Sequence, residues 1–144
     1  MTENSIPKKG ADLNLEINSL AFGGMGVARY NGIVVFVKNS IPGQKVNARI
    51  IKKKGRYLEA RILSVLSKSK YQIPAPCNHF SHCGGCSFQN MNYNEQLIQK
   101  QSQVIDLFKR IGNFKDVPNN PILSCKETYN YRNKMEFTFG NSEW

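Results

Sequence analysis

Three of the chain's four cysteines lie close together, in the segment CNHFSHCGGC that begins at Cys77. Their spacing, Cys-x5-Cys-x2-Cys, is typical of thiolates that hold a metal ion or an iron–sulfur cluster. The two glycines between Cys83 and Cys86 allow unusual backbone dihedral angles and a close approach of the backbone to sulfur. We therefore expect Cys77, Cys83 and Cys86 to be metal ligands.

The residues alone leave open which group is bound and what its fourth ligand is. An iron–sulfur cluster takes four thiolates, whereas a structural zinc ion could be completed by His79 or His82. Such a histidine is more often a surface residue or a neighbour of the ligands than a ligand itself. Cys125, the remaining cysteine, is a candidate for the fourth ligand, but its position far along the chain favours a lone thiol.

The positive charge of the chain is concentrated in one region. The net charge is +10, and nine basic residues lie between Lys45 and Lys70 with Glu59 as the only acid among them. Such density is typical of a nucleic-acid-binding surface, although a solvated face or an acidic partner would also fit. The candidate nucleic-acid contacts are Arg29, Lys38, Lys45, Arg49, Lys52, Lys53, Lys54, Arg56 and Arg61.

Composition restricts the class of protein further. Hydrophobic residues make up 40% of the chain and charged residues 21%, as in ordinary folded proteins. No apolar run is long enough to span a bilayer, so we expect no membrane partner. The first ten residues, MTENSIPKKG, lack the apolar core of a secretory signal. We expect a cytoplasmic protein, in which clustered cysteines bind metal more often than they form disulfides.

Residues 12–70 alternate between strand patterns and turn signals. Asn31-Gly32 joins two strand-like runs and predicts a tight hairpin. The glycine-rich segment 21–26 follows no buried strand and opens no helix, so a turn or bulge is favoured over a phosphate-binding loop. The five predicted strands, which suggest a small closed barrel of the oligonucleotide-binding type, cover residues 13–17, 27–30, 33–37, 46–51 and 58–66.

One helix and one further strand are expected beyond the cysteines. Asn92 followed by Glu95 forms a capping-box pattern at the start of the helix, and Gly112 is the expected stop. Apolar residues recur between Leu97 and Ile111 at helical spacing, which favours a face buried in a core. Residues 131–139 alternate as a strand with one apolar face. That strand has no partner in the sequence, so we expect the chain to be cut within a domain.

Taken together, three segments resemble the RNA uracil-5-methyltransferases that carry an N-terminal TRAM domain, close to the bacterial 23S ribosomal RNA enzymes. They read GGMGVARYNGIVVFVKNSIPGQKV, CNHFSHCGGCSFQNMNYNEQLIQKQSQV and YNYRNKMEFTFG. The resemblance implies a mainly β (α+β) fold with four parts. These are a disordered arm over residues 1–11, an OB-like TRAM barrel over 12–70, an iron–sulfur segment over 71–92, and over 93–144 a helix with the first strand of a truncated central domain.

The resemblance also implies a function. The TRAM barrel would bind RNA, as in the bacterial 23S ribosomal RNA enzymes, and Cys77, Cys83 and Cys86 would bind a 4Fe–4S cluster whose fourth ligand lies outside this sequence. Such enzymes transfer a methyl group from S-adenosylmethionine to carbon 5 of a uracil. The catalytic and S-adenosylmethionine-binding residues belong to a domain that this sequence does not include. We therefore assign no catalytic residue and expect a monomer that is inactive by itself.

A different class of function also fits the residues. The features visible in the sequence are suited to binding RNA or metal, and none of them indicates catalysis. The alternative is therefore a stand-alone, non-enzymatic RNA-binding module with a structural zinc or iron–sulfur site. A salt series of RNA binding and an analysis of bound metal would test this alternative.

Overall fold

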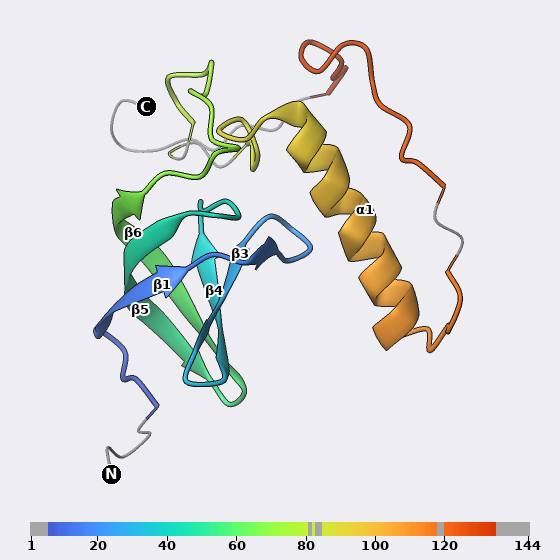
Figure 1. Ribbon diagram of the computed structural model, residues 1–144. Coiled ribbons are helices and arrows are strands. Elements are labelled where there is room, and N and C mark those ends of the chain that lie inside the picture. The colour runs from blue at the N-terminus through green and yellow to red at the C-terminus, as the bar shows by residue number, and fades with distance from the viewer. Residues whose placement is uncertain (1–5, 81, 83–84, 118–119, 135–144) are drawn as a thin grey trace. The chain divides into compact units, whose positions relative to one another are not determined.

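The computed structural model describes residues 6–80, 82, 85–117 and 120–134 (Figure 1). The chain divides into two compact units, Met1–Gln72 and Ile73–Trp144. The first unit holds all the strands of the described residues, and the second holds their one helix. Each unit is described by itself below.

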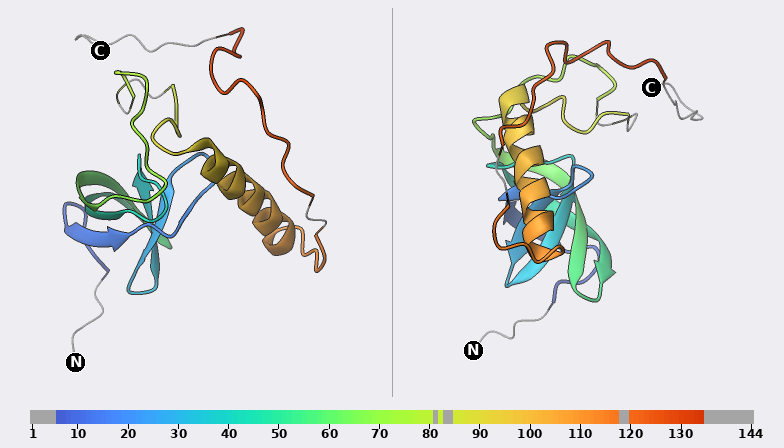
Figure 2. Two further views of the ribbon diagram at one scale, coloured as in Figure 1. Left: turned by 45° about the horizontal axis from the view of Figure 1, so that its top comes forward. Right: turned by 90° about the vertical axis from the view of Figure 1, so that its right-hand side faces the viewer.

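The first unit consists of one curled sheet that contains both antiparallel and parallel strand pairs (Figure 2). Its strand order is β1-β5-β6-β4-β3-β2. All neighbouring strands are antiparallel except β4 and β6, which run parallel. The strands are β1 (Asp12–Glu16), β2 (Ser19–Leu20), β3 (Gly26–Tyr30), β4 (Ile33–Lys38), β5 (Lys45–Lys54) and β6 (Tyr57–Ser67).

The structure confirms the mainly β class but not the number of strands. It has six strands rather than five, because Ser19–Leu20 forms the short strand β2 beside β3. A two-residue strand is too short to show a period of two in the sequence, so pattern reading misses it. The other five strands lie where the alternation predicts them.

Side chains alternate between the two faces of each strand, and the apolar ones line the inner face of the curled sheet. Along β1, for example, Leu13 and Leu15 are buried while the residues between and beside them are exposed. Burial of this apolar surface is the main stabilising contribution to such a small unit. The core cluster consists of Leu13, Leu15, Ile17, Ala28, Val35, Val37, Val46, Ala48, Ile50, Leu58 and Ala60.

Two turns fix the register of the strands. Asn31 and Gly32 have φ angles of 48° and 80° and connect β3 to β4, which confirms the predicted hairpin. Positive φ at both central residues suits the right-handed twist of the strands that they join. The segment 21–25 makes a turn rather than a phosphate-binding loop, and Ala21 N–H donates to the Met25 carbonyl over 2.8 Å.

The second unit contains the helix α1 (Tyr93–Arg110). Its N-cap is Asn92, whose side-chain oxygen accepts from the Glu95 N–H at 2.8 Å, so the predicted capping position is confirmed. The helix ends before Ile111, whose N–H still donates to the Leu107 carbonyl. Within the described residues, no helix is both long and apolar enough to cross a bilayer.

Two predictions concern the second unit: a buried apolar face on α1 and a strand over residues 131–139. The prediction that the apolar face of α1 is buried is wrong within the described residues, where Ile98, Val104, Phe108 and Ile111 are exposed. The predicted strand over residues 131–139 is only partly within the described residues. Residues 131–134 are described and form no strand, and the rest of that segment lies outside.

Candidate nucleic-acid interface and cysteine segment

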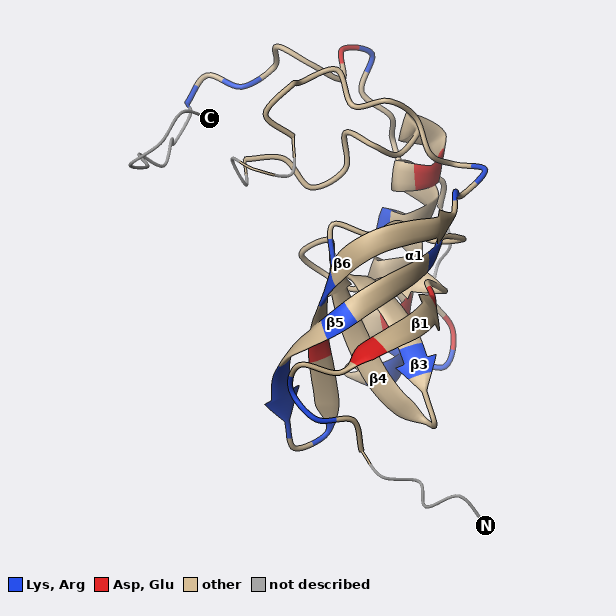
Figure 3. Cartoon of the chain, turned by 90° about the vertical axis from the view of Figure 1, so that its left-hand side faces the viewer, with Lys and Arg blue, Asp and Glu red and all other residues tan. Residues whose placement is uncertain are grey.

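Strand register lines up charged side chains across the outer face of the sheet. Asp12 pairs with Arg49, Arg49 pairs with Arg61, and Arg61 pairs with Lys38, so one row crosses β1, β5, β6 and β4. Directly opposed residues point to the same face of a sheet. Ala60, the neighbour of Arg61, is fully buried, and the row therefore faces outward. Figure 3 marks the basic and acidic positions along the strands of the sheet.

A second row lies two steps along the same face. Lys54 pairs with Tyr57, Tyr57 pairs with Val34, and Val34 pairs with Arg29. The row thus crosses β5, β6, β4 and β3 and places a cation at each end. The sheet brings together cations that are far apart in the sequence, because β6 lies between β5 and β4.

A third row, between the first two, adds an aromatic ring and an ion pair. Lys52 pairs with Glu59, and Glu59 pairs with Phe36. The Lys52 ammonium lies 3.9 Å from the Glu59 carboxylate. Together the three rows form one surface, which we call the basic outer face; it consists of Asp12, Arg29, Val34, Phe36, Lys38, Arg49, Lys52, Lys54, Tyr57, Glu59 and Arg61.

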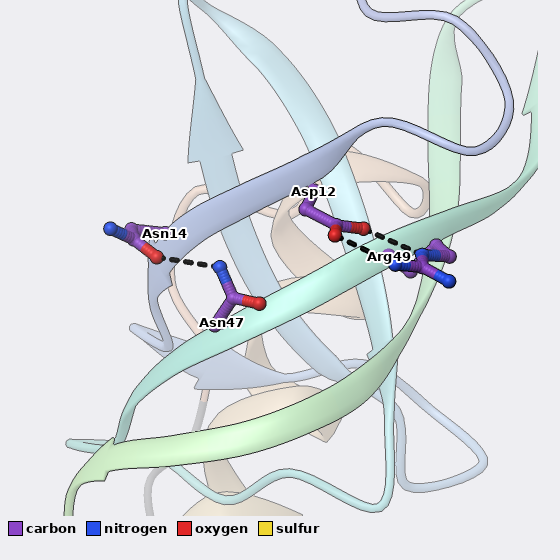
Figure 4. Close-up of polar contacts among 4 residues, drawn as sticks. All are labelled: Asp12, Asn14, Asn47 and Arg49. Atoms are coloured by element: carbon purple, nitrogen blue, oxygen red, sulfur yellow. Dashed lines mark hydrogen bonds and ion pairs between the residues drawn. The ribbon is translucent and has the colours of Figure 1, made fainter.

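The Arg49 guanidinium is held by a two-point contact with Asp12 (Figure 4). Its Nε and Nη2 atoms donate to the two carboxylate oxygens over 2.7 and 2.8 Å. Beside this pair, the Asn47 side-chain amide donates to the Asn14 side-chain oxygen over 2.8 Å. Both contacts join β1 to β5 on the solvent side of the sheet.

This contact changes the ionisation of both partners. The hydrogen bond from Arg49, together with its charge, holds the pKa of the Asp12 carboxyl below its ordinary value. The same hydrogen bond raises the pKa of Arg49. Asp12 is ionised in the neutral range, and its negative charge compensates that of Arg49. Arg49 is one of the residues predicted to contact nucleic acid.

The predicted nucleic-acid contacts differ in how much of their charge is available. Lys45 lies 3.7 Å from Glu16, and Arg49 and Lys52 also have acidic partners. Arg29 donates to the Gly32 carbonyl over 3.4 Å, which leaves its charge uncompensated. No ion pair within the described residues involves the remaining five, Lys38, Lys53, Lys54, Arg56 and Arg61.

In the cysteine segment, one glutamine side chain joins two of the predicted ligands. The Gln89 side-chain oxygen accepts from the Cys77 N–H at 3.1 Å, and its amide nitrogen donates to the Cys86 sulfur at 3.1 Å. Both cysteines are free thiols. The donor set, two accessible thiols joined by an amide that can donate to a thiolate, fits a metal ion or cluster held by sulfur. Cys83 lies outside the described residues.

The other candidate ligands add little to this arrangement. The Cys125 thiol donates to the Glu127 carbonyl over 3.0 Å, and the Cys125 N–H donates to the Tyr93 hydroxyl over 2.9 Å. The described residues, which leave out Cys83, contain no group of three or more histidine, cysteine or acidic side chains that could hold a metal ion. The three-cysteine site therefore stays a prediction.

Sequence reasoning missed three residues of these surfaces. Phe36 and Tyr57 follow the strand alternation, but the parallel pairing of β4 with β6 that brings them together has no local signal. Gln89 lies three residues after Cys86. Its position so close to a cysteine pair is the sequence signal that could have identified Gln89 as a residue that orients the ligands.

The chain matches one domain family and is similar in sequence to several RNA methyltransferases. Residues 8–63 match the TRAM domain. The chain is 43% identical over 134 residues to a protein of Clostridium tetani named as an uncharacterized RNA methyltransferase, which covers 93% of this chain and 29% of that protein. Proteins of the same name from Aquifex aeolicus and Bacillus cereus are 38% and 36% identical, over 90% and 94% of this chain and 30% of each relative. The chain thus spans less than a third of the length of these relatives.

Two solved structures show weaker likeness. A conserved protein of Methanococcus maripaludis has a TM-score of 0.40 and 28% identity, covering 44% of this chain and 93% of that one. A tRNA (uracil-54, C5)-methyltransferase of Pyrococcus abyssi, solved with S-adenosyl-L-homocysteine, has a TM-score of 0.44 and 20% identity, covering 66% of this chain and 21% of that one.

Proposed function

Since this chain belongs to the family of TRAM-domain RNA methyltransferases, we propose that it supplies the RNA-binding N-terminal part of an S-adenosylmethionine-dependent enzyme. The proposed reaction is methylation of carbon 5 of a uracil, with 23S ribosomal RNA as the substrate. The first unit binds the RNA in this proposal. The chemical step belongs to parts of the relatives that this chain does not span.

The observation that carries the proposal is the basic outer face of the first unit. A surface on which cations from four strands are brought together attracts the phosphate backbone, whatever the base sequence. Lys53, near the end of β5, and Arg56, in the turn between β5 and β6, add to this charge. The described acids of the face, Asp12 and Glu59, are each paired with a cation, so they offset only part of its positive potential.

Binding of RNA to the full chain across a salt series tests the proposal. We expect the logarithm of the binding constant to fall linearly with the logarithm of the salt concentration. The triple variant Lys53→Gln, Lys54→Gln and Arg56→Gln should bind all RNA sequences more weakly and with a shallower slope, because three phosphate contacts are lost. The matched control neutralises Lys109, Arg110 and Lys115 in the second unit. Absent or salt-independent binding by the unaltered chain would overturn the proposal.

We further propose that Cys77, Cys83 and Cys86 hold a 4Fe–4S cluster, with zinc as the alternative. The group would brace the loop between the sheet unit and α1, and no electron-transfer role follows from these residues. Metal and sulfide analysis after anaerobic purification distinguishes the two. Iron with acid-labile sulfide supports the cluster, and stoichiometric zinc without sulfide refutes it. Cys83→Ser should lower the metal content, whereas Cys125→Ser should leave it unchanged.

The proposal includes two properties of the protein in solution. We propose that it acts as a monomer in the cytoplasm. Light scattering across a concentration series checks the first property, and fractionation of cells that make the protein checks the second. A mass that doubles with concentration would contradict the monomer.

A further inference from the structure

An aromatic pair lies in the middle of the basic outer face. Phe36 on β4 and Tyr57 on β6 meet edge to face, with ring centroids 5.2 Å apart and the ring planes at 77°. Both side chains remain partly exposed, although Val35, Val37 and Leu58 beside them are fully buried. An edge-to-face contact uses at most one face of one ring, so aromatic surface remains open to solvent.

Cations lie on two sides of the aromatic pair. Lys54 is directly opposite Tyr57 on the neighbouring strand β5. Two residues beyond Phe36 on the same face of β4, Lys38 is opposite Arg61 of β6. Lys38, Lys54 and Arg61 have no ion pair within the described residues. The rings therefore lie between cations whose charge is available to a ligand.

The acid nearest to the rings has its own partner. Glu59 is opposite Phe36, and its carboxylate lies 3.9 Å from the Lys52 ammonium. Its repulsion of a phosphate is therefore reduced. Beyond Tyr57, the apolar Val34 and the cation Arg29 complete the row.

This combination of rings and cations fits one kind of ligand. An exposed ring on a basic sheet stacks against the flat face of a nucleobase, while the cations bind the phosphates on either side. In a duplex those base faces are already covered by neighbouring base pairs, so the ligand has unpaired bases. We propose that Phe36 and Tyr57 form a stacking site for an unpaired RNA base, and that Lys38, Lys54 and Arg61 contact the flanking phosphates. This inference rests on the proposed RNA binding and specifies the form of RNA that is bound.

A structural role for the pair has to be separated from stacking, because cross-strand aromatic pairs also stabilise sheets. The full chain is titrated with decauridine and with an abasic ribose-phosphate chain of equal length. Phe36→Leu and Tyr57→Leu should each weaken decauridine binding about 5- to 150-fold, since stacking contributes about 1–3 kcal/mol per base. Neither should change binding to the abasic chain or the salt slope. Tyr57→Phe keeps the ring and should bind like the unaltered chain.

A second measurement uses the unaltered protein and so does not depend on the folding of any variant. Decauridine with one 2-aminopurine in place of a uridine should lose fluorescence on binding, because stacking quenches that base. Unchanged fluorescence, or equal loss of affinity in Phe22→Leu, would overturn the stacking site; Phe22 is 83% exposed but lies in the turn between β2 and β3. If decauridine binds with a normal salt slope and both leucine variants bind as tightly, the stacking site is wrong and RNA binding stands. If neither probe binds, RNA binding itself is wrong.

Discussion

At the scale of single residues, Asp12 limits how much charge the row Arg49–Arg61–Lys38 presents to a ligand. It accepts two hydrogen bonds from Arg49, which lower its pKa further below the neutral range, where an aspartate is already ionised. A solvent-exposed ion pair of this kind contributes little to stability. Its larger consequence is electrostatic, because one carboxylate cancels one guanidinium on the surface proposed to meet phosphate.

Removal of this carboxylate should strengthen RNA binding. In Asp12→Asn the charge of Arg49 is no longer compensated, so affinity for single-stranded RNA should rise severalfold at low salt. If Arg49 then neutralises one more phosphate, the salt slope should steepen by about 0.7. Glu127→Gln is the matched control, because it changes the net charge equally but lies in the second unit. Equal gains in both variants would show that only net charge matters.

Gln89 is the residue that orients two of the proposed metal ligands. Its side chain contacts the Cys77 backbone and the Cys86 sulfur at the same time. A hydrogen bond to sulfur stabilises the thiolate over the thiol, and thiolates are the form that binds metal. Gln89 therefore links the geometry of the cysteine segment to its chemistry.

Replacement of Gln89 by leucine should weaken retention of the metal or cluster that we propose. The variant keeps the size of the side chain but loses both contacts, so metal affinity should fall about 10–100-fold. Metal content after dialysis against a chelator measures the effect. Gln103→Leu, on α1, is the control and should retain as much metal as the unaltered chain. If Gln89→Leu retains its metal fully, Gln89 has no part in holding the site.

At the scale of elements, the parallel pairing of β4 with β6 makes the basic outer face. It sets Lys38 beside Arg61 and brings the Phe36 ring against that of Tyr57. Neither neighbour can be predicted from local sequence, because the residues that meet are more than twenty positions apart. The alternation of each strand, by contrast, is visible in the sequence and predicts correctly which side chains face outward.

The close approach of β3 to the segment after β4 depends on Gly26. A Cβ atom there would lie 2.9 Å from Ile17 Cγ2 and 3.2 Å from Ser40 Cβ, and would overlap Ser40 Oγ. Ser40 cannot easily turn away, because its buried hydroxyl donates to the Val37 carbonyl over 2.9 Å. The close packing of these segments therefore requires glycine.

Substitution of Gly26 should destabilise the first unit. Gly26→Ala forces the core to shift, which typically costs about 1–3 kcal/mol of unfolding free energy. Urea unfolding followed by circular dichroism measures it. The control Gly55→Ala adds the same methyl group where no atom lies within 4 Å and φ is not positive, so it should change stability little. Equal effects of the two substitutions would contradict the steric explanation.

At the scale of the whole molecule, the first unit has a complete core of its own. Every residue of the core cluster lies between Leu13 and Ala60, well inside Met1–Gln72. The exposed apolar face of α1 belongs to the second unit. The two units therefore differ in how much of their apolar surface the described chain covers.

This difference predicts that the first unit folds alone. A fragment of residues 1–72 should unfold cooperatively in urea and bind single-stranded RNA with the salt slope of the full chain, because the basic outer face lies entirely within it. The second unit alone, residues 73–144, is the comparison and should unfold at lower urea concentration. A fragment 1–72 that shows no cooperative transition would contradict the prediction.

The sequence by itself determined the strands, the Asn31-Gly32 hairpin and the Asn92 cap, because each depends on residues that are neighbours along the chain. It also identified the basic residues and, by resemblance, the family. Only the tertiary structure decided which cations share a surface, that Asp12 offsets Arg49, and that Phe36 meets Tyr57. These depend on the order of strands in the sheet, which follows from how distant segments pack together. The three cysteines stay a sequence prediction, to which the structure adds the contacts of Gln89.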